Sequence, residues 1–211
     1  MASSRVAGLR ALDRAFFSRR PQRVARELLG KVLVRRSSTE FLTGRIVETE
    51  AYLGEDDPAA HAAAGNTART SVLFGPPGHA YVYFIYGNHY CLNVSCEGNG
   101  GGVLIRALEP LQGIEYMARN RGIARAGARD LRKLTSGPGR LAQAFGITRA
   151  RDNGCDLVSE SSSLRIVKDG FRAGPIVVTP RIGITKAAEE PLRFVLEGNP
   201  FVSGGKLRAI S

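Results

Sequence analysis

Long apolar stretches are missing from this sequence. No segment is long and apolar enough to cross a bilayer, and residues 1–20 carry scattered arginines without the apolar core of a signal peptide. A membrane-spanning protein and a secretory precursor are therefore not indicated, and we expect a soluble, cytoplasmic protein.

Cysteine and histidine are scarce, with three residues of each in 211. The nearest cysteines, Cys91 and Cys96, have no second pair at CxxC spacing and no histidine at the spacing of metal ligands. Neither structural zinc nor a disulfide framework is indicated, and buried, reduced cysteines are the expectation.

Acidic residues are outnumbered, 19 against 30 basic ones, which gives a formal net charge of +11. Residues 1–40 and 106–151 each hold ten basic and three acidic side chains, whereas residues 41–61 hold one arginine and five carboxylates. A bias of the genome towards arginine codons could explain the arginine count but not this acidic segment. The pattern favours an anionic partner that meets a basic surface around an acidic site.

The length and a hydrophobic content of 43% suit one compact domain over residues 1–211, with disorder expected over about the first 15 residues. Residue patterns and turn signals predict strands at 31–36, 41–52, 80–86, 90–97, 103–108, 164–167, 176–179 and 193–197, and helices at 21–29, 111–120 and 140–145. We therefore predict an α+β fold in which helices surround a curved, largely antiparallel sheet with a protruding β-hairpin.

The strand predicted at 41–52 carries the first candidate site. Glu48, Glu50 and Tyr52 alternate along it and so share one face, and the strand leads into a long loop with His61. Strands often carry exposed acids, so the two glutamates alone are a weak signal. Together with Tyr52 and His61 they indicate a cleft with a general base.

Three tyrosines occur in the strand predicted at 80–86, namely Tyr81, Tyr83 and Tyr86. Aromatic packing in a sheet explains them as well as stacking on a nucleic-acid base does. Residue types alone leave both interpretations open.

Ordered motifs decide between these interpretations. The segments ETEAYLGEDDPAAH (48–61), LFGPPGHAYVYFIYG (73–87), LNVSC (92–96), VLIRALEPLQG (103–113) and TSGPGRLAQAFGI (135–147) resemble one family. It is the alkyladenine (3-methyladenine, alkylpurine) DNA glycosylase family, and the resemblance extends from about Leu28 to Phe201.

The resemblance implies a monofunctional DNA glycosylase of base excision repair, associated with the nucleoid through its DNA binding. Such an enzyme flips an alkylated or deaminated purine out of double-stranded DNA and hydrolyses its N-glycosidic bond with a water activated by glutamate. It implies a monomer that needs no metal and no cofactor. None of the five lysines lies in a local pattern for a Schiff base, which also favours simple hydrolysis over lyase chemistry.

The catalytic roles carry over motif by motif. Glu50 matches the glutamate that activates the water, and Arg106, in IRALEP, matches the arginine that helps to hold this water. The main-chain carbonyl of Ile182, in RIGI, would be the third partner of the water. Glu48 has no such match, and we expect it to contribute much less than Glu50.

The binding roles carry over in the same way. Tyr52, His61 and Tyr83 match the walls of the base pocket, and His61 would also hydrogen-bond the purine edge. Asn93 matches the asparagine that disfavours the 2-amino group of normal guanine. Tyr86 matches the wedge at the tip of the hairpin, which fills the gap left in the base stack.

The sequence departs from the usual family pattern in two places. Residues 65–69 read GNTAR, so Asn66 and Ala68 replace an arginine and a proline that are common there, and Asn88 stands where methionine is frequent. Tyr83 and Tyr86 should also point to opposite faces of a regular strand, which requires the turn to re-aim Tyr86 if both roles hold.

Two other classes of function remain to be weighed. A magnesium-dependent nuclease could use the carboxylates Glu48, Glu50, Glu55, Asp56 and Asp57, although turn and helix-capping roles explain the two aspartates more simply. A binding protein without activity could use the same sheet, but binding alone does not need Glu50, His61, Asn93 and Arg106 together.

Overall fold

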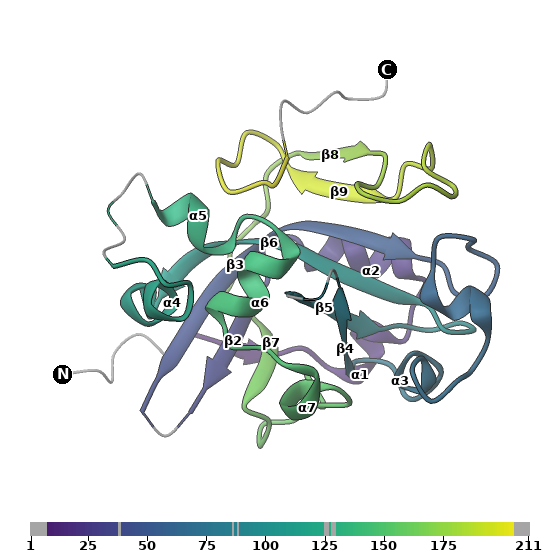
Figure 1. The fold of residues 1–211 in the computed structure, drawn as a ribbon, viewed down its shortest axis with the longest axis horizontal. Coiled ribbons are helices and arrows are strands. Elements are labelled where there is room, and N and C mark those ends of the chain that lie inside the picture. The colour runs from purple at the N-terminus through teal and green to yellow at the C-terminus, as the bar shows by residue number, and fades with distance from the viewer. Residues whose placement is uncertain are drawn as a thin grey trace.

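Nine strands form one antiparallel sheet (Figure 1) in the computed structural model, which describes residues 8–37, 39–85, 87, 89–124, 127 and 130–204. The strands follow the order β1-β7-β2-β3-β6-β5-β4, and β9 pairs with both β3 and β8. Together with the surrounding helices this curled sheet confirms the predicted α+β class.

The strands are β1 (Arg10–Ala11), β2 (Val32–Arg36), β3 (Phe41–Tyr52), β4 (Ala80–Ile85), β5 (His89–Ser95), β6 (Gly102–Gln112), β7 (Leu164–Lys168), β8 (Ile176–Thr179) and β9 (Arg193–Leu196). The helices are α1 (Arg14–Phe17), α2 (Pro21–Leu28), the 3-10 helix η1 (His61–Ala64), α3 (Ser71–Phe74), α4 (Ile114–Asn120), α5 (Leu131–Thr135), α6 (Pro138–Ala144) and α7 (Arg149–Asp152). No helix in these ranges is long and apolar enough to cross a membrane.

Strand β3 connects three parts of the sheet. It pairs with β2 through residues 41–45, with β6 through residues 43–52, and with β9 through residues 48–50. Its register against β6 shifts on both sides of Glu48. A β-bulge of this kind changes the direction of side chains and is common next to active sites.

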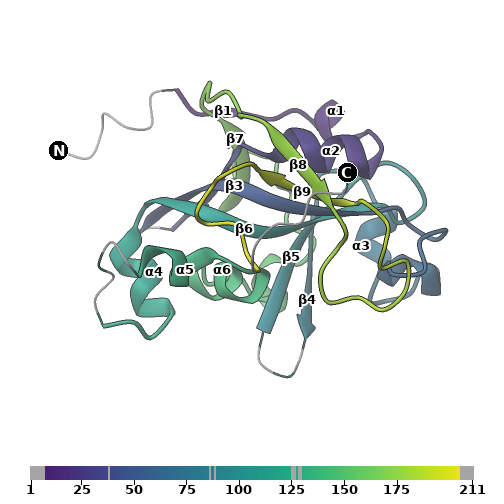
Figure 2. The ribbon, with the colours of Figure 1, turned by 90° about the horizontal axis from the view of Figure 1, so that it is seen from above.

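The two faces of β3 have different partners. On one face Thr49 is buried and donates a hydrogen bond to the carbonyl of Ala25 in α2. Val24, Ala25 and Leu28 are the buried side of this amphipathic helix. Glu48 and Glu50 therefore point to the opposite face, and Figure 2 shows α4, α5 and α6 on that side of the sheet.

The helix predicted at 111–120 begins later than the sequence indicates. Strand β6 continues to Gln112, and Gly113 then turns the chain with a φ of 77° before α4 starts at Ile114. A Cβ atom at Gly113 would lie 2.3 Å from the Leu42 side chain, so only glycine fits this turn. The start predicted at Leu111 is wrong because the pairing of β6 with β3 extends beyond Leu108.

Two short elements, β1 and α1, lie within the first 17 residues. Strands β4 and β5 pair as the predicted hairpin, with Ala80 opposite Val94 and Ile85 opposite His89. Tyr86 and Asn88 lie outside the described residues, so the wedge at the hairpin tip stays a prediction.

Candidate active site

A cavity of about 430 Å³ lies against β3, β4, β5 and β6, and residues of η1, α3 and α6 and residues 182–184 also line it. This volume is within the usual range of small-molecule sites, roughly 300–1,000 Å³. Six of the predicted site residues line it: Tyr52, His61, Tyr83, Asn93, Arg106 and Ile182. The fold thus brings together side chains that are up to 130 residues apart in the sequence.

Glu50 lies immediately behind this wall and is fully buried. Its Oε1 accepts a hydrogen bond of 2.8 Å from the amide of Ile182, and its Oε2 accepts one of 3.0 Å from the Tyr52 hydroxyl. Arg106 Nη1 lies 3.2 Å from the same Oε2. The carboxylate therefore contacts three residues that line the cavity.

Burial decides the electrostatics of Glu50. Loss of hydration raises its pKa, and the charge of Arg106 and the hydrogen bonds from Ile182 and Tyr52 only partly offset this effect. A carboxylate with a raised pKa is a stronger base than one in water, and this property suits a group that takes a proton from water.

Glu48 is the second buried carboxylate on this face. Its Oε1 accepts hydrogen bonds from Arg106 Nε at 2.9 Å, Arg193 Nε at 2.7 Å and Ser203 Oγ at 2.9 Å, and its Oε2 accepts one from the Ser203 amide at 2.6 Å. Two glutamates and two arginines thus form a buried, charge-balanced group. Sequence reasoning missed Arg193 and Ser203, because nothing in their local sequence indicates a partner about 150 positions earlier.

Aromatic rings form one wall of the cavity. The ring centroids of His61 and Tyr83 are 4.4 Å apart in an edge-to-face arrangement, and Tyr81 OH lies 2.9 Å from His61 Nδ1. Burial, with a contribution from Arg69, lowers the pKa of His61, so the ring is neutral at neutral pH. Tyr81 lines the cavity beside Tyr83, as strand alternation requires, although no pocket role was predicted for it.

Asn93 is buried on β5 between this wall and Arg106 in β6. Its side-chain amide donates a hydrogen bond of 3.2 Å to the carbonyl of Tyr81, which fixes its orientation. Cys91, two residues earlier, also lines the cavity, and burial raises the pKa of its thiol. The thiol is therefore protonated at neutral pH and forms part of the apolar lining.

A buried ion pair ties together two loops at the cavity. Arg181 contacts both carboxylate oxygens of Asp57, at 2.5 and 3.0 Å, and donates a further hydrogen bond to the carbonyl of Ala51. Its guanidinium carbon lies 4.8 Å from the centroid of the Tyr52 ring. Asp57 also accepts from the Leu53 and Ala59 amides, which agrees with its predicted turn role. The pair with Arg181 is the part that sequence reasoning missed.

Carboxylates of the acidic segment do not gather into a metal site in the described ranges, where no group of three or more His, Cys, Asp or Glu side chains could hold an ion. Glu48 and Glu50 contact arginines instead, and Asp57 pairs with Arg181.

Comparison with known proteins identifies the family. Residues 15–200 match the sequence model of methylpurine-DNA glycosylase. A protein of Koribacter versatilis, provisionally named 3-methyladenine DNA glycosylase, is 62% identical over 206 residues, which cover 97% of this chain and 98% of that protein. Proteins with the same provisional name from Burkholderia lata and Methanocella arvoryzae are 49% and 48% identical, with coverage of 91% or more of each chain.

The chain belongs to the methylpurine-DNA glycosylase family. It is therefore a glycosylase that hydrolyses N-glycosidic bonds. It acts in DNA repair and processes alkylated purines. DNA is its substrate. The family assignment agrees with the resemblance found in the sequence.

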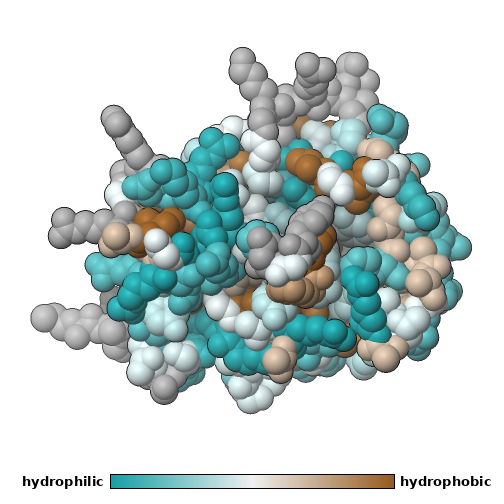
Figure 3. All heavy atoms as spheres, in the orientation of Figure 1, coloured by the Kyte–Doolittle hydropathy of each residue, from teal (hydrophilic) through white to brown (hydrophobic). Residues whose placement is uncertain are grey.

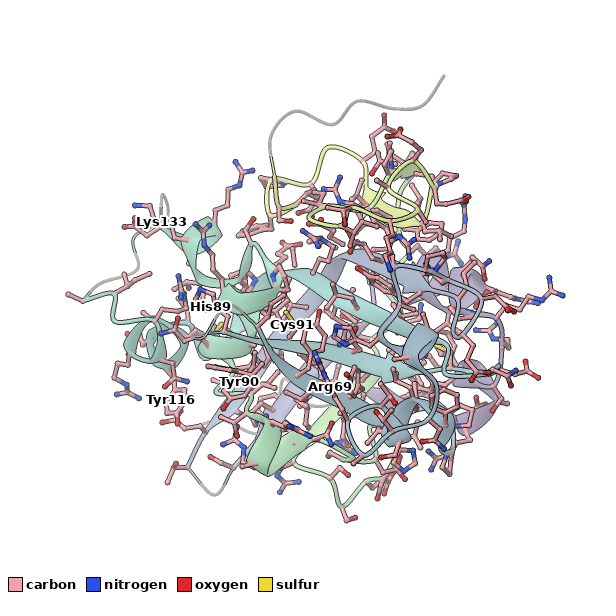
Figure 4. The ribbon with its side chains drawn as sticks, turned by 45° about the vertical axis from the view of Figure 1, so that its right-hand side comes forward. Arg69, His89, Tyr90, Cys91, Tyr116 and Lys133 are labelled. Carbon is pink, nitrogen blue, oxygen red and sulfur yellow. The ribbon has the colours of Figure 1, made fainter. Side chains whose placement is uncertain are left out.

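The departure from the family pattern at residues 65–69 lies beside the cavity. Thr70 Oγ1 donates a hydrogen bond to the carbonyl of Gly65 and so closes this segment into a tight turn. Arg69 Nη2 then lies 3.5 Å from Nε2 of His61. Figure 4 shows Arg69 and Cys91 near the middle of the view, and Lys133 and Tyr116 at its left edge with α4 and α5.

Exposed apolar side chains are few on the surface around the site. Phe84, at the end of β4, is 48% exposed, and Ile182 at the cavity is 39% exposed. On the face drawn in Figure 3, apolar side chains occur as small patches among hydrophilic ones. Such a surface suits a polar, charged partner better than a large apolar one.

Proposed function

We propose that the protein flips an alkylated or deaminated purine, such as 3-methyladenine, out of duplex DNA into the cavity and hydrolyses its bond to the sugar with a water activated by Glu50. One observation carries this proposal. A fully buried glutamate with a raised pKa touches three lining residues of a cavity with aromatic walls, namely Tyr52, Arg106 and Ile182.

The chemistry needs one base and no metal. The bond between C1′ and the purine nitrogen breaks, its electron pair leaves with the purine, and the water oxygen bonds to C1′ while its proton passes to Glu50. Alkylation at a ring nitrogen makes the purine cationic and a better leaving group. As the bond breaks, positive charge develops on the sugar, and the Glu50 carboxylate stabilises it.

Arg106 and Ile182 support the proposed base. Arg106 would help to hold the water, in agreement with its place in the wall and its 3.2 Å distance from Glu50 Oε2. The Ile182 amide donates to Glu50 Oε1, so this oxygen stays in place while Oε2 faces Arg106 and Tyr52. We keep the Ile182 carbonyl as a proposed partner of the water.

The cavity would select the damaged base. Tyr52, Tyr83 and His61 provide aromatic surface for stacking, which contributes roughly 1–3 kcal/mol per base in single-strand binders. A neutral His61 can hydrogen-bond the purine edge without repelling a cationic base. Asn93, held by the Tyr81 carbonyl, would oppose the 2-amino group of guanine.

Binding of the duplex would depend on the basic segments, which contact phosphates and read no sequence. Tyr86 would fill the gap that the flipped base leaves. We further propose that the protein acts as a monomer without metal, in the cytoplasm at the nucleoid.

The direct test is an excision assay on duplexes that carry 3-methyladenine, 7-methylguanine, hypoxanthine or ethenoadenine, each with and without chelator. We expect release of at least one of these bases with an intact sugar-phosphate backbone and no effect of the chelator. Strand cleavage that chelator abolishes would instead support the nuclease, and binding of duplex without release of any base would support the inactive binding protein.

A further inference from the structure

We propose that Glu48 is a positioning residue, held by Arg193 and Ser203, that fixes Arg106 in the orientation in which Arg106 faces Glu50; this inference rests on the proposed function. Nothing in the family resemblance assigned a role to Glu48, and the sequence suggested that it matters little. Its contacts point to the opposite conclusion.

Glu48 uses both carboxylate oxygens and accepts four hydrogen bonds. Arg106 donates a hydrogen bond from Nε to Glu48. The planar guanidinium then directs Nη1 towards Glu50 Oε2, and Nη2 lies 3.5 Å from Ser203 Oγ. Because the guanidinium is rigid, fixing one nitrogen fixes the direction of the others. Glu48 therefore sets the position of the group proposed to hold the water.

The residues that hydrogen-bond Glu48, apart from Arg106, lie near the end of the described chain. Arg193 lies on β9, where it pairs with Glu50 across the strands, and its Nη2 donates to the carbonyl of Ser203 at 2.9 Å. Ser203 in turn gives Glu48 two hydrogen bonds, one from its amide and one from its hydroxyl. Residues 193–203 thus bring the contacts of Glu48 from the neighbouring strand β9 and the segment that follows it, which Figure 1 shows in yellow.

A neutral amide at position 48 cannot replace this carboxylate. Every group that faces Glu48 is a donor, and one end of a glutamine side chain would present further N–H groups to them. Arg193 would also lose its ion pair with a carboxylate, and Arg106 would keep only the one with Glu50. We expect Arg106 to turn away from the position in which it holds the water.

Loss of the charge at Glu48 has a second, electrostatic effect on Glu50. Glu48 raises the pKa of Glu50 and Arg106 lowers it, and the effect of Arg106 is the larger. Glu48→Gln, which displaces Arg106, therefore raises that pKa and moves the acid limb of the pH profile to higher pH. The charged and titratable groups around Glu50 are Glu48 and Tyr52 on β3, Arg106 on β6, Cys91 on β5, Arg193 on β9 and Arg181 in the loop after β8. A purely structural defect would not move this limb.

Four variants of the full chain test the proposal by single-turnover excision across the acid limb and by thermal melting. Glu48→Gln should slow excision at neutral pH roughly 10- to 100-fold and shift the limb to higher pH. Glu48→Asp keeps the charge and should leave the limb in place. Ser203→Ala removes only the hydroxyl donor and should reduce the rate by less than tenfold.

Asp152→Asn is the matched control, because Asp152 is equally buried and pairs with Arg35 at 2.8 Å. It lies in α7, at the opposite edge of the molecule from β9 in Figure 1. This variant should lower the melting temperature and leave the pH profile unchanged.

A wild-type rate and limb in Glu48→Gln would overturn the proposal. The proposal would also be overturned if the excision rate fell in proportion to the melting temperature in both Glu48→Gln and Asp152→Asn. NMR titration of the Glu50 carboxyl group does not depend on enzyme activity. It compares the wild type with Glu48→Gln. If Glu48→Gln does not fold, Ser203→Ala takes its place. Absence of base release by the wild type would refute the proposed function, while an unchanged Glu50 titration would refute the role of Glu48.

Discussion

The hydroxyl of Tyr52 donates a hydrogen bond of 3.0 Å to Oε2 of Glu50, two residues earlier on the same strand. The ring of Tyr52 lines the cavity, so one side chain serves both the proposed base pocket and the proposed catalytic base. Alternation along β3 makes this possible, because residues 50 and 52 lie on the same face.

Tyr52→Phe should therefore change the pH dependence of excision. The hydroxyl lowers the pKa of Glu50, so its removal raises that pKa further, and Glu50 acts as a base only when ionised. We expect the acid limb of the single-turnover rate to move to higher pH, with the greatest loss at acidic pH. Tyr83→Phe, whose ring also lines the cavity, is the control and should leave the limb in place.

Glu50→Gln should nearly abolish base release and leave the affinity for a lesion duplex close to that of the wild type. The amide keeps the shape of the side chain but cannot accept a proton, and general-base losses are on the order of 100- to 10,000-fold. Single-turnover excision and a binding titration measure the two effects. Glu55→Gln removes an exposed carboxylate from the same acidic segment and should have wild-type activity; ordinary turnover by Glu50→Gln would contradict the assignment.

Arg181→Met should lower the free energy of unfolding by about 3–5 kcal/mol, because it leaves the buried Asp57 carboxylate without its charge partner. Denaturant unfolding measures this difference. Arg23→Met breaks an exposed pair with Glu27 and should cost about 1 kcal/mol or less. Equal losses in the two variants would mean that burial of the pair between Asp57 and Arg181 has no energetic effect.

The same ion pair predicts a dependence of stability on acid. Burial raises the pKa of Asp57, but hydrogen bonds from Arg181 and from the Leu53 and Ala59 amides lower it overall. The stabilisation is therefore fully present above the unfolded pKa of about 3.9 and is lost as the pH falls through the lower folded value. Unfolding free energies of wild type and Arg181→Met should converge below that range and differ most above it.

Tyr86→Ala should slow excision from a stable duplex much more than from a lesion in an unstable mismatch or in single-stranded DNA. Flipping costs a few kcal/mol in a stable duplex, and a wedge helps only while that cost exists. Tyr83→Ala should slow all these substrates similarly, because a wall of the pocket meets the base however it was paired. If the dependence on pairing appears in Tyr83→Ala instead, the two roles are exchanged.

Sequence alone was sufficient where the relevant contacts are local or where a motif names the residue. The bounds of the strand at 41–52 were predicted correctly, because an alternating pattern between turn signals determines a strand. Two motifs assigned Glu50 and Arg106 to one water, which stays a prediction, and the structure brings these two side chains within 3.2 Å of each other. Neither inference needed the path of the chain in between.

Contacts between distant segments were beyond sequence reasoning. Arg181, Arg193 and Ser203 are 124 to 155 residues away from the carboxylates they contact, and their neighbours carry no pattern that identifies a partner. Local register failed as well: the bulge at Glu48 and the extension of β6 to Gln112 depend on how two strands pair, which neither strand specifies alone.

The dependence of Glu48 on Ser203 has a consequence for biosynthesis. A chain that has left the ribosome as far as β6 already contains Glu50, Tyr52 and Arg106, but the amide and hydroxyl that complete the ligands of Glu48 are still to be translated. The order of synthesis therefore leaves the contacts of Glu48 incomplete until residue 203 has been added, well after the proposed base and its arginine have been made.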